Sequence, residues 1–218
     1  MLEKQLSYKE RVYKEIKNGI LTGQYPPGSV MNERKLSAEL GISRTPIREA
    51  LQMLARDGWL QMEIYKGAVV REFDPHSMWE LTRVRCALEL SAIEDAVRNL
   101  TDADLLKLRQ IQEKQQALLS HYNPDEFISL DRAFHSYIYQ LSHNKELIKL
   151  VSNYYDMFRF LGMQALGKTE QRRATTIAEH RAILEAMERR DPEGAIQAMK
   201  AHMDETANNI RSNIGLEP

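Results

Sequence analysis

Four polar residues fall on apolar helix faces in the second half of this 218-residue chain. Asp131 and His135 are four residues apart, so they share one helix face, beside a stripe of phenylalanine and isoleucine. His180 and His202 each fall on a separate apolar stripe further along the chain. A buried imidazole or carboxylate must be paired or bound to something, because burial without a partner is costly.

Three imidazoles and one carboxylate are typical ligands of a divalent metal ion. Zn²⁺ suits this set best, with Ni²⁺ and Mn²⁺ as alternatives, and the set leaves positions open for a further ligand. The competing interpretation is that each histidine is a core side chain bonded to a carbonyl, and the residues alone favour neither. The other histidines, expected at the surface near helix ends or in loops, are His76, His121 and His143.

Arg85 lies on the apolar stripe of another helix, so its guanidinium is expected to point inward, where it needs an anion. One interpretation pairs it with Glu89, one helical turn later. The other makes Arg85 a bidentate clamp for the carboxylate of a small effector. The sequence leaves both interpretations open.

A second group of polar residues lies in the first third of the chain, where Arg44 and Arg48 flank the beginning of a helix. The planar fork of arginine bonds O6 and N7 of guanine together, which predicts that this helix enters the major groove of DNA. The plainer alternative is a set of amphipathic helices with solvated arginines. The residues expected to contact DNA are Arg34, Ser43, Arg44, Thr45, Arg48, Lys66 and Gly67.

Two helices are expected before the one that carries these arginines. Ser7 and Glu10 form a capping box that opens the first helix, and Gly23 suits its end. Asn32 caps the second helix, which stops at Gly41. Their order and spacing predict the first part of a helix-turn-helix.

The third helix and a hairpin complete a winged helix-turn-helix. Because the residue before a proline avoids the helical region, Thr45 is expected as N-cap and Pro46 as the first helical residue. Gly58 ends this helix. The β-prone runs 60–64 and 68–71 then predict the two strands of the wing.

The rest of the chain has helical periodicity without a strand pattern, which predicts an all-helical bundle. The predicted fold is therefore mainly α, with a winged helix-turn-helix at 1–73, a linker at 74–76 and a helical effector-binding and dimerisation domain at 77–218. The expected helices of the bundle are 75–98, 101–121, 124–142, 144–163, 170–189 and 192–212.

Charge and composition agree with this division. Residues 1–72 carry 12 Lys+Arg and 9 Asp+Glu, a net charge of +3, and the remainder carries −4, for a total of −1. A basic front half suits phosphate contacts. The single cysteine excludes an internal disulfide and a multi-thiolate metal site. The chain also has no apolar run near ~18 residues and no signal peptide, which predicts a cytoplasmic protein without a membrane partner.

The pattern GxYPPGxxMxERKLxxxLGxSRTPxREALxxLxxxG resembles the N-terminal domain of the GntR family of bacterial transcription regulators. The helical half is similar to the FadR C-terminal domain, the effector-binding module of the largest GntR subfamily. One branch of that module carries the pattern D-x-x-x-H…E-H…H, matched here by Asp131, His135, His180 and His202. Glu179, the acidic member of the pattern, is expected to face solvent rather than to bind metal.

The resemblance implies a homodimer on a short palindromic operator, governed by a small organic acid or sugar acid near the metal. The chain is thus expected to be a ligand-responsive regulator, associated with the nucleoid when bound to DNA, and not an enzyme. One alternative is a regulator whose bundle only dimerises around a structural metal. A metallohydrolase is a remote third interpretation, because no general base stands at a spacing such as that of H-E-x-x-H.

Overall fold

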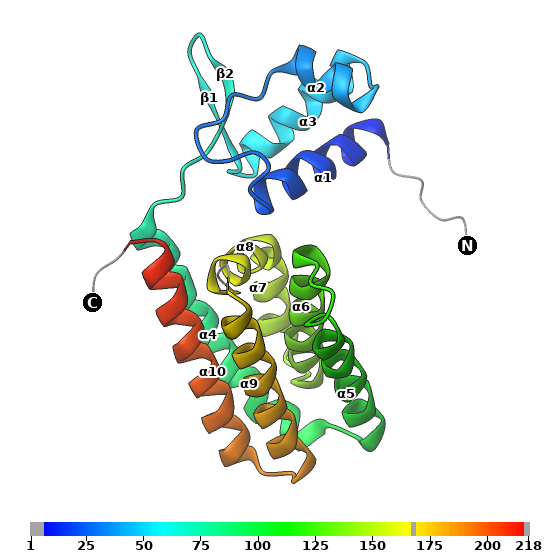
Figure 1. The fold of residues 1–218 in the computed structure, drawn as a ribbon, viewed down its shortest axis with the longest axis vertical. Helices are drawn as coiled ribbons and strands as arrows, with labels where there is room; N and C mark the ends of the chain where they lie inside the picture. The colour runs from blue at the N-terminus through cyan, green and yellow to red at the C-terminus, as the bar shows by residue number, and fades with distance from the viewer. Residues whose placement is uncertain (1–6, 167–168, 216–218) are drawn as a thin grey trace. The chain divides into compact units, whose positions relative to one another are not determined.

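The computed structural model describes residues 7–166 and 169–215, and the chain divides into two compact units, Met1–Asp74 and Pro75–Pro218. Within its described residues the N-terminal unit has three helices and one hairpin (Figure 1). The elements are α1 (Tyr8–Leu21), α2 (Glu33–Leu40), α3 (Arg44–Arg56), β1 (Leu60–Glu63) and β2 (Gly67–Val70). This arrangement confirms the expected winged helix-turn-helix.

The ends of the first two helices follow the local signals. The Ser7–Glu10 capping box forms at the beginning of α1, with both of its reciprocal hydrogen bonds. The Asn32 side chain accepts from two backbone N–H groups at the beginning of α2. Gly41 ends α2 in the left-handed region at a φ of 65°, a conformation that costs glycine little.

The N-cap of α3 is Ser43, so the prediction of Thr45 was wrong. Arg44 and Thr45 are helical ahead of Pro46, which is the third residue of the helix. Proline is tolerated there because the first N–H groups of a helix have no partner within it. As a result Arg44 and Arg48 both belong to α3, one turn apart on the same face.

The wing is an antiparallel hairpin in which Leu60 pairs with Val70 and Glu63 with Gly67. Gly67 has a φ of 82°, which lets the chain turn back sharply after the tip. A further bridge joins β2 to Val30, just before α2. This bridge ties the wing to the segment that leads into the helix-turn-helix.

Helices are the regular elements of the C-terminal unit in its described residues, and α10 runs beside α4 and α9 (Figure 1). Because α4 begins at Pro75, residues 75 and 76 of the expected linker lie in its first turn. The helices of this unit are α4 (Pro75–Asn99), α5 (Asp102–Ala117), α6 (Pro124–Leu141), α7 (Lys145–Asn153), α8 (Tyr155–Leu166), α9 (Glu170–Glu188) and α10 (Pro192–Asn213).

The single helix expected over 144–163 is two helices, α7 and α8, separated at Tyr154. Residues 153–155 are asparagine and two tyrosines, all weak helix formers, so a break there costs little. α7 packs against α4 and α6, whereas α8 also packs against α9 and α10. The tertiary packing, which local periodicity does not encode, decides this break.

Candidate DNA-binding surface and buried histidine centre

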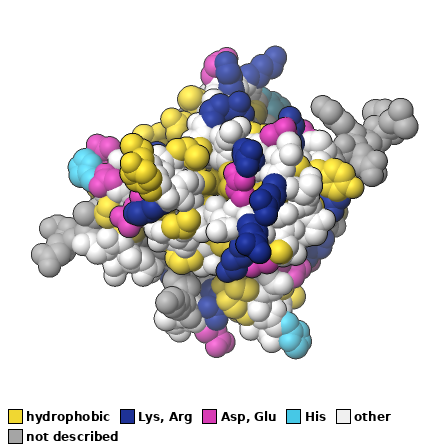
Figure 2. All heavy atoms as spheres, turned by 90° about the horizontal axis from the view of Figure 1, so that it is seen from above, with side chains coloured by type: hydrophobic (Ala, Val, Ile, Leu, Met, Phe, Trp, Pro, Cys, Tyr) yellow, Lys and Arg dark blue, Asp and Glu magenta, His cyan; other side chains and the backbone are white. Residues whose placement is uncertain are grey.

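Five of the expected DNA-contacting residues line one surface hollow of the N-terminal unit, about 510 Å³ in volume. The five, contributed by α2, α3 and the wing, are Arg34, Arg44, Arg48, Lys66 and Gly67. Figure 2, a view onto this unit, shows Lys and Arg side chains gathered in a band. Ser43 and Thr45 are exposed at the beginning of α3, outside the hollow.

Surface carboxylates hold two of these cations. Glu33 accepts from Arg48 through both of its oxygens, at 2.9 Å from Nε and 2.8 Å from Nη2, and this bonding lowers the pKa of the Glu33 carboxyl. Lys66 lies 2.7 Å from Glu63 in the wing. A DNA ligand must therefore displace Glu33 to reach the fork of Arg48. No helical spacing connects residues 33 and 48, so sequence reasoning missed this pair.

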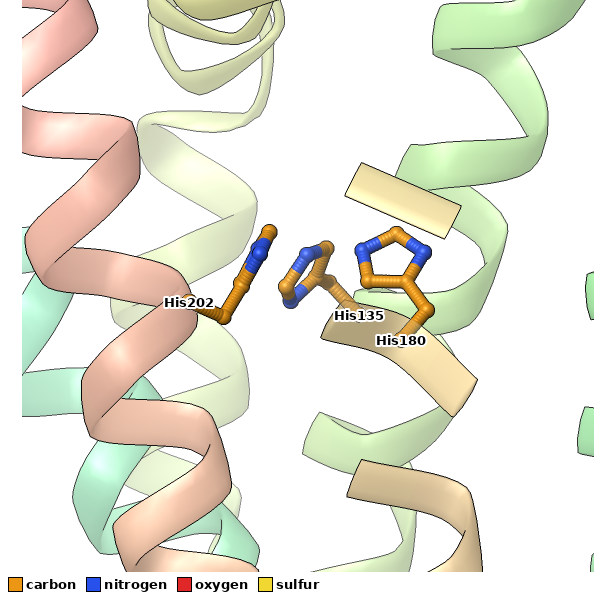
Figure 3. Close-up of side chains that lie close together, drawn as sticks. All are labelled: His135, His180 and His202. Carbon is orange, nitrogen blue, oxygen red and sulfur yellow. The ribbon is translucent and has the colours of Figure 1, made fainter. Parts of the chain in front are cut away.

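The four expected metal ligands come together in the interior of the C-terminal unit. Asp131 and His135 come from α6, His180 from α9 and His202 from α10, and all four are buried. One ring nitrogen from each histidine lies within 4.8 Å of those of the other two. Figure 3 shows the three rings close together between their helices. The Nε2 atom of His180 is also 3.6 Å from Oδ1 of Asp131.

Each imidazole is oriented by a hydrogen bond between its Nδ1 atom and a side-chain oxygen. The partner of His135 is Glu89 at 3.0 Å, that of His180 is Gln115 at 2.9 Å, and that of His202 is Glu179 at 2.7 Å. The buried Nε2 atoms of His135 and His180 have no hydrogen-bond partner. Metal-ligating histidines are held in this way, with one nitrogen bonded to an acceptor and the other left for the metal.

The protonation states also suit a cation. Burial lowers the pKa of His180 well below its usual value, and the neighbouring His202 acts in the same direction. Burial, followed by His135, lowers the pKa of His202 to about 3. Burial opposes ionisation of Asp131, but the facing His135 and His180 hold its pKa below the usual value. The centre therefore offers neutral imidazoles at His180 and His202 and a carboxylate at Asp131, the forms that bind metal.

Arg85 is 2% exposed, and its Nε atom donates to Glu89 at 3.2 Å, as the first interpretation of the sequence had it. Glu89 also accepts from the hydroxyl of Tyr139. Arg85 lines a small cavity of about 10 Å³ together with Asp131 and His202. Arg85 therefore pairs with Glu89 and lines the cavity at the same time, so the two interpretations of its role do not exclude each other.

Sequence reasoning misplaced one residue of the centre and missed others. Glu179 does not face solvent: its side chain is 14% exposed, and it bonds both His202 and Arg172. Glu179 points inward because the buried guanidinium of Arg172 and the Nδ1 atom of His202 both bond to its carboxylate. Arg172 and Thr176 line the same cavity, and their positions two turns and one turn before His180 on the same helix were a usable signal. Gln115 carried no such signal.

The other histidines, His76, His121 and His143, are exposed as expected. In the described part of the chain, none of the helices combines the length and apolar character that crossing a membrane requires.

Two family models match the chain, one for each unit. Residues 8–70 match the model of bacterial regulatory proteins of the gntR family, and residues 80–205 match the FCD domain. The HTH-type transcriptional regulator YdhC of Bacillus subtilis is 30% identical over 212 residues, which cover 96% of this chain and 94% of YdhC.

Solved structures show the same architecture. That of Escherichia coli McbR has a TM-score of 0.77 at 26% identity and covers 95% of this chain and 99% of McbR. A metal-free FCD domain has a TM-score of 0.56 over 67% of this chain and 99% of its own; at 19% identity it shows the fold alone.

These relatives are named as transcription regulators, which supports a regulator and argues against the metallohydrolase interpretation. The chain belongs to the GntR family of bacterial transcription regulators, with an FCD effector domain as its C-terminal unit.

Proposed function

We propose that this regulator binds a short palindromic operator as a homodimer, and that a small carboxylate bound beside a divalent metal ion controls its DNA affinity. The histidine centre carries the proposal. Three buried imidazoles from three helices approach one another, and each Nδ1 atom is bonded to a side-chain oxygen. Such a cluster would not stabilise an apolar core, because burying ring nitrogens without hydrogen-bond partners costs free energy of folding.

The N-terminal unit, residues 1–73 in this proposal, reads the operator. Arg44 and Arg48 reach guanine edges from α3, Arg34 and Lys66 contact phosphates, and Gly67 lets the wing approach the backbone closely. The hydroxyls of Ser43 and Thr45 complete the set at the beginning of α3. One such unit buries too little surface for tight specific binding, so two copies read two half-sites. A protein bound to the chromosome in this way acts in the bacterial cytoplasm.

In the C-terminal unit, residues 77–218 in this proposal, the metal ligands would be Asp131, His135, His180 and His202. Zn²⁺ fits the donor set best, and Ni²⁺ and Mn²⁺ are the alternatives. The bound ion would supply a Lewis-acidic centre with positions open to an effector oxygen. Glu89, Gln115 and Glu179 fix the ring orientations.

Arg85 binds the effector carboxylate in this proposal. Its guanidinium lies in the wall of the cavity that also contains Asp131 and His202, so one acid can contact both the arginine and the metal. Arg172 and Thr206 add donors to the same wall. The cavity is small, about 10 Å³ or roughly the space of one water molecule, so an acid enters only if the cavity widens, and a long acyl chain is disfavoured.

The second candidate is that the metal only stabilises a dimerisation bundle. The extensive hydrogen bonding of the centre is compatible with a structural ion, which needs no effector. This candidate predicts the same metal content and the same DNA binding. It differs only in the response to small acids.

Thermal unfolding and operator binding, measured on the same metal-loaded chain, separate the two candidates. The probes are acetate, lactate, citrate and gluconate, and the operator comes from selection among randomised palindromes. We expect at least one acid to raise the melting temperature and to shift operator affinity by about 5- to 150-fold. If no acid does either, while metal removal lowers the melting temperature, the structural role is correct.

Arg85→Lys is the matched variant, because lysine keeps a charge opposite Glu89 but loses the bidentate fork. We expect it to weaken the response to the acid while operator affinity without acid stays unchanged. Equal losses in both would show that Arg85 supports folding and does not bind the effector.

A further inference from the structure

Three arginine side chains are buried in the described part of the C-terminal unit, and they differ in their partners. Arg85 pairs with Glu89, and Arg172 pairs with Glu179. Arg132, on α6, is 1% exposed, yet its Nε and Nη1 atoms have no hydrogen-bond partner. A buried guanidinium without an anion is costly, so this difference points to an anion that the chain itself does not supply.

Arg132 lines a hollow of about 400 Å³ formed by α6, α7 and the first residue of α8. The side chains that bring polar atoms to the same hollow include Ser129, Ser136, Gln140, Ser152 and Tyr155. Its volume falls within the range of small-molecule sites. The hollow therefore combines one buried cation with several hydroxyl and amide groups.

Aromatic rings hold the guanidinium of Arg132 in place. Its central carbon is 4.7 Å from the ring centroid of Tyr155 and 6.0 Å from that of Phe158. Such contacts offset part of the cost of burial, but they use the face of the guanidinium and leave its N–H groups free to donate. The donors lie in the guanidinium plane, where a carboxylate or phosphate would meet them.

This hollow is separate from the cavity of the histidine centre, because the two have no lining residue in common. They are nevertheless connected through Tyr139, which lines the hollow and donates its hydroxyl to Glu89. The other oxygen of Glu89 lies 3.0 Å from Nδ1 of His135. An occupant of the hollow would thus lie beside a hydrogen-bond chain that ends at the histidines.

We propose that this hollow, the Arg132 pocket, is a second anion site that takes the carboxylate or phosphate group of a small organic anion without needing a metal. The fork of Arg132 binds two oxygens of the anion, and the half-buried Ser136 offers a hydroxyl from the same face of α6. The site differs from the proposed metal-linked effector site in both its residues and its independence of the ion.

Isothermal titration calorimetry on the full chain tests the proposal, with inorganic phosphate and citrate as probes, before and after metal removal with a chelator. We expect saturable binding of at least one probe in both forms. Phosphate alone would assign a phosphorylated ligand, and citrate alone an organic acid. In Arg132→Gln we expect binding about 10- to 100-fold weaker, because charge-assisted hydrogen bonds are lost.

Arg98→Gln is the matched control, since Arg98 is an exposed arginine of the same unit that pairs with Glu94, and it should bind the probes normally. Ser136→Leu fills the hollow while leaving Arg132 in place, so it must also lose binding even if Arg132→Gln does not fold. Unchanged binding in Ser136→Leu, or no saturable binding by the wild-type chain, overturns the proposal.

The metal-centre variant His180→Ala separates this site from the one proposed above. Probe binding that persists in His180→Ala supports the Arg132 pocket whether or not the wild-type chain carries metal. Binding that disappears in His180→Ala and on metal removal alike would place the anion at the metal and refute a second site. If the wild-type chain carried no metal, the proposed metal site at the histidine centre would be refuted, but the Arg132 pocket would not.

Discussion

The two polar sites of this regulator differ most in their exposure to water. In the pair of Arg48 with Glu33, the side chains are 61% and 33% exposed, whereas in the pair of Arg85 with Glu89, which also bonds His135, they are 2% and 0% exposed. Exposed ion pairs contribute about 0–1 kcal/mol, but removing one partner of a buried pair costs about 3–5 kcal/mol. The DNA surface can therefore exchange its partners, while the histidine centre holds one arrangement.

The largest expected effect removes a ligand from the centre. We expect His180→Ala to abolish stoichiometric metal, a loss beyond the about 10- to 100-fold typical of outer-shell changes, because the His180 Nε2 atom has no substitute. Metal analysis of chain purified without chelator measures this. His121→Ala, at an exposed histidine, should keep its metal. A fully loaded His180→Ala would contradict the assignment.

The next effect concerns the DNA surface. We expect Arg48→Ala to weaken operator binding by about 1–3 kcal/mol per half-site, because a bidentate base contact is lost. Fluorescence anisotropy over a salt series measures it. Arg56→Ala, at an exposed position of the same helix outside the hollow, is the control. Unchanged affinity in Arg48→Ala would show that α3 is not the recognition helix.

A smaller change tests the support of the centre. We expect Glu179→Gln to lower metal affinity about 10- to 100-fold, because a neutral amide makes His202 a poorer ligand than a carboxylate does. Competition with a chromophoric chelator measures the affinity. Glu185→Gln, an exposed position of α9, should behave like the wild-type chain. Equal affinities in both variants would show that Glu179 does not tune the site.

The metal-free chain should lose stability as pH falls below about 6.5. The folded chain keeps His202 neutral down to about 3, whereas the unfolded chain binds a proton near 6.5. In this window the unfolded state binds more protons, so the free energy of unfolding falls by up to about 1.4 kcal/mol per pH unit for this histidine. His180, whose pKa is also lowered, acts in the same direction.

Urea unfolding between pH 7 and 5 in the presence of a chelator measures this dependence. His202→Gln should show a shallower dependence, because it removes one of the two groups. A stability that rises toward pH 5 would contradict neutral, buried imidazoles.

The smallest effect tests whether the DNA surface exchanges partners. We expect Glu33→Gln to raise operator affinity by about 0.2–1 kcal/mol, because Arg48 no longer has to leave a carboxylate. Anisotropy titration measures it, with Glu39→Gln, at an exposed position of α2, as the control. A lower affinity would instead show that Glu33 positions Arg48 for DNA.

Local signals predicted most of the fold. The capping box at Ser7, the cap at Asn32 and the stop at Gly41 each act within one helical turn, and all are present. The failures lie where longer-range packing decides, as at the break after α7. The prediction of Thr45 as the N-cap of α3 failed for a different reason. The rule that residues before proline avoid the helical region is only a preference, and the first turn of a helix tolerates proline at several positions, so the helix begins earlier, after Ser43.

The amino-acid sequence by itself determined the division into two units, the arginines at the beginning of α3 and the placement of four polar residues on apolar helix faces. Each of these features depends on residue types and on their spacing within a few helical turns. Only the tertiary structure decided the partners of those residues. The side chains that orient His135, His180 and His202 are 46, 65 and 23 residues away along the chain. The same holds for Arg132, whose lack of a carboxylate partner becomes visible only when α6, α7 and α8 pack together. Helical periodicity relates residues a few turns apart on one helix, whereas contacts between helices depend on how the whole chain packs.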